Sequence, residues 1–516
     1  MNPPVSTPAR PRSVLVWLDV IFAAAVAPVV CCQIARIFFR QPINYNEGWN
    51  VMFVSRLLSG GPLYGPIDHL PLTPMNYPPL SFFIVGALSR ATGDILLTGR
   101  LITVFSSAIV AVMIFRAVAK ITGAKPAGFF AALFWYALMA GFAPGRLVMY
   151  DPQMLAHVFS VAALWLFTEW RDALIWRRIW LLALLCCLGV FTKHLIVAVP
   201  LAIAAALLME DRSAFRRFAV AASTVGAAMA AAWFWYGGDH LTANLIDSGR
   251  QVLNHRLVVR LTRIFVYRGL IVVFAPFLLL LRQPGKLWRP YIIYFVVSFV
   301  IAAYASRGVG VDINAWFDFF IASAILFGIA AVVVAGSETR GLLASLVTVY
   351  GIATCALPVA FLAFGVGVKR LNHSFELSAE QIAYERQVEV LRSLHGPAVS
   401  ESLLLAYDAG KEFLLEPFNA AQLIAVGRIP ESILTAPIRR REFAAIVLEA
   451  DLQAALCGAR WLEVTTLSRW TPGVLRAIAE NYRPLDGETA PFHFYVPRAA
   501  EQPLTLRCPA APVGNR

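Results

Sequence analysis

Charged residues are scarce in this chain of 516 residues: Asp, Glu, Lys and Arg make up only 15%, against 59% apolar residues. Soluble domains carry about a quarter charged residues, so the composition excludes an ordinary soluble protein. Apolar stretches of a length that can cross a bilayer, about 17 to 25 residues, recur from Val14 to roughly Gly367. The composition therefore predicts an α-helical polytopic membrane protein.

Several other features are also missing. The formal net charge is +13, but the Lys and Arg residues form no basic face with interleaved aromatic side chains, so no nucleic-acid partner is predicted. The seven cysteines show no metal-ligand spacing. Cys457 and Cys508 lie in polar sequence, where an oxidising compartment permits a disulfide, and whether they pair is left open. No internal repeat and no matching pair of Gly/Pro-broken helices is present, which weakens a transporter interpretation.

The apolar runs predict about eleven transmembrane spans, which we place at 14–39, 95–118, 127–144, 152–169, 179–191, 195–209, 218–236, 264–281, 290–305, 317–335 and 342–367. If Arg10 and Arg12 are cytoplasmic, the short basic loops between spans fall inside, as the positive-inside rule requires. These loops are 119–126, 170–178, 210–217 and 282–289. An odd number of spans places the polar tail outside. The predicted domains are a transmembrane domain, 1–368, and an external domain, 369–516.

One further apolar stretch, 77–93, is short for a span and begins with Pro78-Pro79. Counting it as a span would reverse the later loops and place most of the basic ones outside. We therefore predict a helix that lies in the outer interface or is re-entrant. Residues 40–94 then form one large external loop.

The tail is predicted to be a small α/β domain. Strand-like runs occur at 402–407, 412–417, 444–450 and 492–497, and helical patterns occur at 419–427, 431–443 and 471–482. Strands and helices in this order need a common core, so a folded domain is expected rather than an extension.

Two carboxylates are the main candidates for catalysis. Glu47 follows Asn46, a good N-cap, so a helix-start charge is one interpretation and catalysis is the other. Asp151 precedes Pro152, which also suits the start of a helix. The predicted topology places both acids at the outer surface, together with Arg146 and Lys193. Ionisable groups at membrane depth are costly and favour a functional site.

The first external loop carries four motifs in order: Asn46-Glu47-Gly48, Gly-Gly-Pro-Leu-Tyr at 60–64, Tyr-Pro-Pro-Leu at 77–80, and Arg100 at the start of the next span. With the later runs YDPQML, TKH and the segment near 308–325, this order resembles the C-type glycosyltransferases. That superfamily includes the dolichyl-phosphate-mannose protein mannosyltransferases and bacterial aminoarabinose transferase. The resemblance covers about residues 40 to 335. Many members have Asp where this chain has Asn46, so Glu47 acts as base alone or shares the work with Asp151.

The resemblance implies transfer of a sugar, with inversion, from a polyprenyl-phosphate donor at the outer, periplasmic face of a bacterial cytoplasmic membrane. A carboxylate, Glu47 or Asp151, would take the acceptor proton. Cations would stabilise the leaving phosphate, and the candidates are Lys193, Arg146 and Arg307. The candidates for sugar and acceptor binding are Tyr45, Trp49, Tyr77 and His194.

Each of these side chains also has a structural interpretation. In this alternative, Lys193 would snorkel to water, Arg146 would only pair with Asp151, and Arg307 would only mark the end of a span. His194 and the three aromatic residues anchor the chain at the membrane interface.

Two other functions compete with this one. A transporter or lipid flippase predicts ionisable groups near the bilayer midplane, whereas most of those here lie at span ends. A binding protein with a membrane anchor does not need eleven spans. The sugar, the acceptor (a lipid, glycan or protein) and the oligomeric state are left open. No metal site is predicted, but because two carboxylates could bind a divalent cation, metal dependence is left open.

Overall fold

The computed structural model divides the chain into two compact units. The first contains 1–39, 78–233 and 254–377, and the second contains 40–77, 234–253 and 378–516. The structure describes residues 9–247, 252–253, 259, 261, 263–267, 269–281, 285–335, 342–452, 456, 469–485 and 491–499. Cys457 and Cys508, the candidate disulfide pair, lie outside the described residues.

The first unit is helical, and every predicted span coincides with helical structure. The helices are α1 (Ala9–Ala35), α3 (Leu80–Thr92), α4 (Ile95–Thr122), α5 (Lys125–Phe142), α6 (Pro152–Trp170), α7 (Trp176–Thr192), α8 (Ala198–Glu210), α9 (Arg212–Gly237), α12 (Phe274–Leu281), α13 (Arg289–Ala305), α14 (Phe317–Ala335) and α15 (Leu342–Ser374). Four helical stretches of the described residues are long and apolar enough to cross a membrane: Leu15–Phe38, Ile95–Thr122, Arg212–Gly237 and Ile313–Val332. The number of eleven spans stays a prediction.

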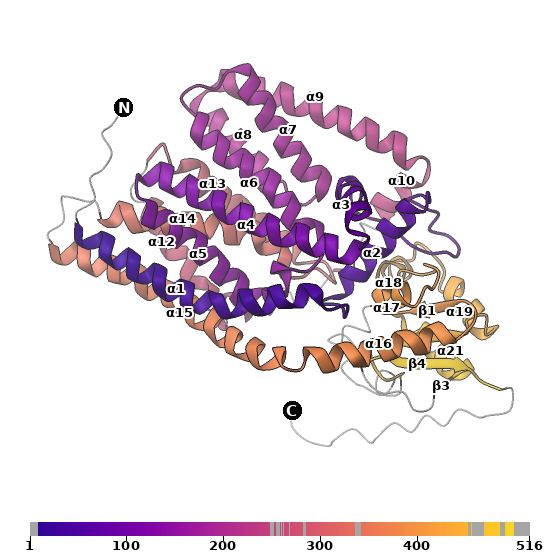
Figure 1. The fold of residues 1–516 in the computed structure, drawn as a ribbon. Helices are drawn as coiled ribbons and strands as arrows, with labels where there is room; N and C mark the ends of the chain where they lie inside the picture. The colour runs from indigo at the N-terminus through magenta and orange to yellow at the C-terminus, as the bar shows by residue number, and fades with distance from the viewer. Residues whose placement is uncertain are drawn as a thin grey trace. The chain divides into compact units, whose positions relative to one another are not determined.

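Helix packing in this unit places α4 against α5 and α6, α6 against α7, and α1 beside α15, as Figure 1 shows. Arg100, in the second turn of α4, is fully buried. Its guanidinium donates to the backbone carbonyls of Arg36 (3.1 Å), Ile37 (3.3 Å) and Phe39, just after the end of α1. The last carbonyls of a helix have no partner within it, so Arg100 satisfies acceptors that would otherwise be buried unpaired. The arginine of the fourth motif therefore has a structural role.

Helix α3 tests the interpretation of 77–93. It begins at Leu80, directly after Pro78-Pro79, and ends at Gly93, whose φ of 74° is left-handed. Its 13 residues extend about 20 Å, well short of the roughly 30 Å hydrocarbon core. This length agrees with an interfacial or re-entrant helix rather than a span.

The predicted span at 264–281 is not one continuous helix. A π-helical segment (Arg263–Tyr267) is followed by Gly269, then a 3-10 turn (Leu270–Val273) and α12. Gly269 has a φ of 71°, a left-handed conformation that glycine adopts at little cost and that interrupts an α-helix. The apolar pattern alone did not reveal this interruption.

The second unit contains a four-stranded sheet, and the predicted α/β fold of the tail is confirmed. The strands are β1 (Ala398–Ser400), β2 (Ala445–Leu448), β3 (Tyr482–Pro484) and β4 (His493–Pro497), in the order β1-β2-β4-β3. β1 is parallel to β2, and the other two pairs are antiparallel.

Both faces of this sheet are buried, as the alternating side chains of β2 show. Ile446 and Leu448 belong to one core, and Ala445 and Val447 belong to the other. The first core is completed by α18 (Pro417–Ala425), α19 (Ser432–Arg439) and α21 (Pro472–Asn481). The second core is completed by α16 (Leu377–Ser393) and α17 (Leu403–Asp408). The unit is therefore a three-layer sandwich.

Two of the predicted strands are wrong. Residues 402–407 form helix α17, in which Leu403, Leu404 and Leu405 are all buried. Residues 412–417 form no strand, and Leu415 makes only an isolated parallel bridge to Leu72 of the first loop. The N–H of Leu72 donates to the carbonyl of Leu414 (2.7 Å), and its carbonyl accepts from Glu416 (2.8 Å).

Residues 40–77 of the first loop therefore belong to the same compact unit as the tail. The domain boundary predicted at 368 falls inside α15. The chain passes from the first compact unit to the second after Leu377.

Membrane topology is the first testable prediction. In a cysteine-depleted protein, a single cysteine placed in the 170–178 loop should resist an impermeant thiol reagent in intact cells. A cysteine in the tail should react, since the tail is expected outside. Labelling of the 170–178 cysteine in intact cells would overturn the assignment.

Candidate active site

Asp151 starts helix α6. Its backbone is extended (φ −145°, ψ 136°), and its Oδ1 accepts the N–H of Gln153 at 2.8 Å. Pro152 follows at the first helical position, where the missing N–H costs nothing. The helix-start interpretation of this aspartate is therefore correct, but it accounts for only one of its contacts.

Two buried cations hold the same carboxylate. Nη1 of Arg146 lies 2.8 Å from Oδ2 of Asp151, and Nζ of Lys193 lies 2.9 Å from Oδ1. All three side chains are less than 10% exposed. Lys193 therefore does not snorkel to water. It is held beside Asp151 at the C-cap of α7.

A second acid contacts Arg146. Nη2 of Arg146 lies 2.6 Å from Oδ2 of Asp312, whose side chain is 49% exposed. Asp312 was not predicted as a site residue, although it lies in the segment near 308–325 that carries part of the resemblance. The sequence did contain one indication of it: counting the predicted spans places the start of the span 317–335 at the same surface as Asp151. Arg146 thus joins a buried carboxylate to a partly exposed one.

The charge state of Asp151 follows from these contacts. Burial alone raises the pKa of this carboxyl, but the charges of Lys193 and Arg146 outweigh burial and lower the pKa to about 2. Hydrogen bonds from Lys193 and from the N–H of Gln153 act in the same direction. Asp151 is therefore ionised at neutral pH and is a weak proton acceptor.

A second buried polar network lies beside the first and was also missed. Nε2 of Gln153 is 3.1 Å from Nε2 of His157, and Nδ1 of His157 is 3.6 Å from Oδ1 of Asp318. The hydroxyl of Tyr294 donates to the same Asp318 oxygen at 2.6 Å. The i,i+4 spacing of Gln153 and His157 was the available signal.

The depth of this network bears on the competing functions. His157 lies five residues, about 8 Å, inside α6, and Asp318 lies in the first turn of α14. Both are near helix ends rather than at the midplane that a transporter site would occupy.

Glu47 belongs to the second unit, in the first turn of α2 (Tyr45–Leu58). The predicted N-cap, Asn46, is wrong. The cap is Asn44, whose side chain accepts the N–H of Asn46 at 3.1 Å. Glu47 is fully buried, and its Oε2 accepts the N–H of Ile43 at 2.7 Å.

The glycine of the Asn-Glu-Gly motif has a packing reason. A Cβ on Gly48 would lie 2.2 Å from the backbone nitrogen of Leu404, so α2 approaches α17 too closely for any side chain at this position.

The three predicted aromatic residues also lie in the second unit. The ring of Trp49 is buried and packs edge-to-face against the rings of Phe53 and Tyr77, with ring centres 4.8 Å and 4.9 Å apart. The hydroxyl of Tyr45 donates to Glu416, and the guanidinium of Arg469 lies 4.1 Å from the centre of its ring. These contacts fix the rings firmly.

Glu416 is a further buried acid that sequence reasoning missed. It also accepts the N–H groups of Phe418 (3.2 Å) and Asn419 (2.7 Å), and burial raises its pKa to about 7.

The remaining candidates are peripheral to these clusters. The side chain of His194 is exposed, beside Lys193. Arg307 is partly buried and stacks over the ring of Tyr304 at 4.5 Å.

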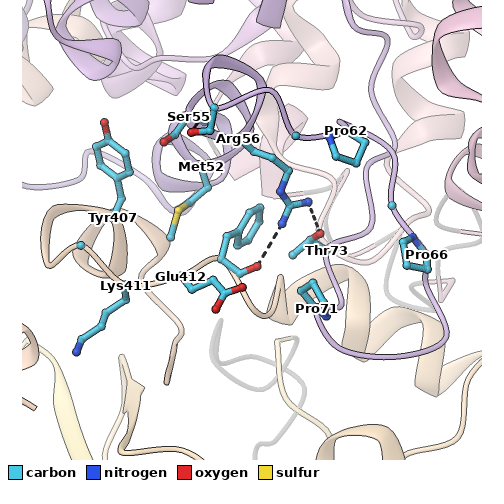
Figure 2. A pocket seen from close by; sticks show the side chains of 15 residues that line it. Met52, Ser55, Arg56, Pro62, Pro66, Pro71, Thr73, Tyr407, Lys411 and Glu412 are labelled. Carbon is cyan, nitrogen blue, oxygen red and sulfur yellow. Dashed lines mark hydrogen bonds between the residues drawn. The ribbon is translucent and has the colours of Figure 1, made fainter. Parts of the chain in front are cut away.

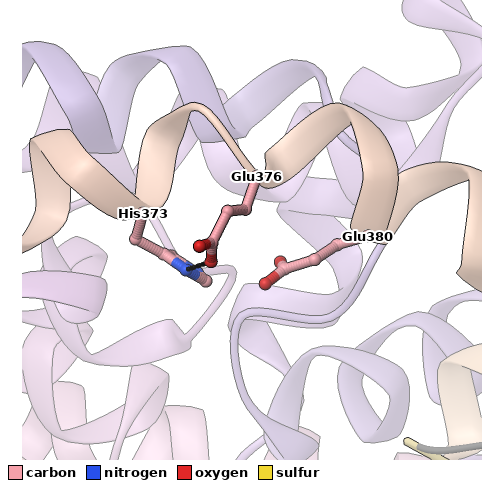
Figure 3. Close-up of side chains that lie close together, drawn as sticks. All are labelled: His373, Glu376 and Glu380. Carbon is pink, nitrogen blue, oxygen red and sulfur yellow. Dashed lines mark hydrogen bonds and ion pairs between the residues drawn. The ribbon is translucent and has the colours of Figure 1, made fainter.

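At the end of α15, Nδ1 of His373 pairs with Glu376 at 3.2 Å, as Figure 3 shows. His373 is partly buried and Glu376 is exposed, and exposed acidic groups are common without a metal ion. The pair gives no argument for a resident metal.

The sequence matches no protein-family model, and no curated protein matches it. Solved structures do match. The crystal structure of ArnT from Cupriavidus metallidurans in the apo state aligns with a TM-score of 0.57 at 15% identity, covering 85% of this chain and 94% of ArnT. ArnT bound to undecaprenyl phosphate aligns with a TM-score of 0.55 at 13% identity over the same shares. The chain therefore has the fold of ArnT, and the predicted fold, a polytopic helical membrane protein with a small α/β tail, is confirmed.

Proposed function

We propose that the chain transfers a sugar from a polyprenyl-phosphate donor to an acceptor at the outer face of the cytoplasmic membrane. The carrying observation is the buried Arg146–Asp151–Lys193 cluster at the ends of helices in a C-type fold. The similar ArnT structure that contains undecaprenyl phosphate supports the donor class. A lipid-linked donor also explains why such a cluster belongs in a membrane protein.

Arg146 and Lys193 are the proposed ligands of the donor phosphate. Asp151 pairs with both, so it holds two cations in place in a buried setting where neither would stay ionised cheaply alone. A leaving phosphate gains negative charge as the glycosidic bond breaks, and fixed cations stabilise that charge without reorganising. Arg307 is a third proposed phosphate ligand.

Glu47 is the proposed general base. A base must be able to accept a proton near neutral pH, and the pKa of about 2 makes Asp151 poorly suited. We therefore assign Asp151 to positioning the cations and Glu47 to taking the acceptor proton, with inversion at the anomeric carbon. Tyr45, Trp49, Tyr77 and His194 are proposed to bind the sugar or the acceptor.

The second prediction tests this function directly. Membranes that contain the protein should transfer label from at least one member of a panel of radiolabelled polyprenyl-phosphate hexoses and pentoses to an endogenous acceptor. Membranes with Lys193→Met should lose most of that transfer, because the leaving phosphate loses a buried cation. Lys120→Met, which changes an exposed lysine in the last turn of α4, is the control. The proposal fails if no donor in the panel is consumed faster than in control membranes.

A further inference from the structure

The second unit contains an open pocket of about 530 Å³ that the proposed chemistry does not use. Its walls come from the first loop, from the end of α17 and from the segment after it, and Figure 2 shows its side chains. Met52, Ser55, Arg56 and Ser59 form one wall. Their spacing of i, i+3, i+4 and i+7 places them on a single face of α2. The pocket is therefore built into the helix that carries Glu47.

Rigid apolar residues of the first loop form a second wall. Gly61 and Pro62 belong to the Gly-Gly-Pro-Leu-Tyr motif, and Pro66 and Pro71 follow in the same loop. Proline fixes its own backbone torsion, so a loop of this composition loses little freedom when a ligand binds. The motif, which carries no chemistry in the proposed mechanism, thus contributes to a preformed surface.

Both signs of charge face the hollow. The guanidinium of Arg56 lies 4.7 Å from the centre of the Phe413 ring, and it donates to Oγ1 of Thr73 (2.6 Å) and to the carbonyl of Phe413 (3.2 Å). The exposed side chain of Glu412 lies toward the same space. Its negative charge interacts favourably with the positive charge of Arg56. Lys411 points away from the hollow and donates to the carbonyl of Leu394.

This combination restricts the ligand by elimination. An anionic ligand would meet the Glu412 carboxylate, and a cationic ligand would meet Arg56. A purely apolar ligand would desolvate both charged groups without pairing them. A neutral polyhydroxylated ring satisfies all three conditions, because its hydroxyls donate to Glu412 and accept from Arg56, and its C–H face packs on proline and methionine.

We propose that this pocket binds a neutral sugar unit of the acceptor, remote from the hydroxyl that reacts. Glu47 and Arg56 are nine residues apart on α2, about 13 Å along the helix. An acceptor held in the pocket would thus have to extend beyond the bound sugar unit for another hydroxyl to reach the base. The identification as an acceptor site rests on the proposed function, whereas the binding of a neutral sugar does not.

Binding without catalysis is the third prediction. The full-length protein in detergent, with no donor present, is tested by saturation-transfer NMR against neutral gluco-, galacto- and manno-trisaccharides and a galacturonic acid trisaccharide. At least one neutral trisaccharide should bind, and the acidic one should bind more weakly. Glu412→Gln should weaken binding about tenfold, since one charged hydrogen-bond acceptor is lost. Ser59→Trp, at the exposed C-cap of α2, should block the pocket.

Two further variants separate the outcomes. Glu480→Gln, an exposed acid on α21, should bind like wild type. Glu47→Gln should also bind like wild type, because the pocket does not need the base. Absence of binding for every neutral trisaccharide, preference for the acidic one, or unchanged binding in both pocket variants would overturn the proposal. Neutral-sugar binding without any polyprenyl-phosphate transfer would retain the pocket and reject the function.

Discussion

Glu47→Gln should lower turnover about 10²- to 10⁴-fold while the protein still folds and still binds donor. The amide keeps the size of the side chain and an oxygen that can accept the N–H of Ile43, but it cannot take a proton. If Glu47 were only a helix-start charge, its loss would cost roughly 0.3 to 1 kcal/mol of stability and leave turnover almost intact. Initial rates at saturating donor, with thermal unfolding of the same preparation, separate these outcomes.

The control is Glu480→Gln, which removes an exposed carboxylate on α21 and leaves α2 and the residues before it unchanged. Its turnover should equal that of the wild type. Transfer at a normal rate in Glu47→Gln would remove Glu47 from the role of base. If Asp151→Asn, corrected for its folded fraction, had then lost activity, the role would pass to Asp151. Normal rates in both variants would defeat a carboxylate mechanism altogether.

The sequence predicted the helices of the first unit well because each apolar run is long and bounded by polar or helix-breaking residues. It also placed Lys193 and Arg146 with Asp151, because counting the predicted spans puts all three residues at the same side of the membrane. The predicted order of spans places Asp312 at that surface too, but one aspartate before a span has no pattern that marks it as a site residue. The pairing with Arg146 is a tertiary contact that only the structure reveals.

The tail was harder for a related reason. A short apolar run such as 402–407 fits either a buried strand or a buried helix, and periodicity cannot separate the two when every face is covered. The single bridge of Leu415 has its partner, Leu72, in the first loop, more than 340 residues earlier. Local patterns within the tail contain no trace of that pairing. The Tyr45–Glu416 contact escaped prediction in the same way.

Asp151→Asn should produce the largest loss of stability, about 3 to 5 kcal/mol, because it leaves Lys193 and Arg146 buried without their shared counterion. Since the pKa of Asp151 is lowered from its ordinary 3.8 to about 2, its stabilisation is present above the ordinary value. That stabilisation is lost only as the pH falls through the folded-state pKa. Near neutral pH Asp151 stays ionised, so only the substitution removes this stabilisation. Equilibrium unfolding in mixed micelles measures the difference.

Asp312→Asn is the control, because it removes a carboxylate from the same arginine at a half-exposed position. Solvent screens that pair, so its loss should cost no more than about 1 kcal/mol. Adding Lys193→Met to Asp151→Asn should recover part of the stability, since it removes a buried charge that has lost its Asp151 carboxylate. Transfer should stay low, because the proposed phosphate ligand is also absent. Equal destabilisation by Asp151→Asn and Asp312→Asn would mean that burial does not set the strength of the cluster. Recovery of transfer together with stability in the double variant would show that Lys193 is a structural partner of Asp151 and not a ligand of the donor.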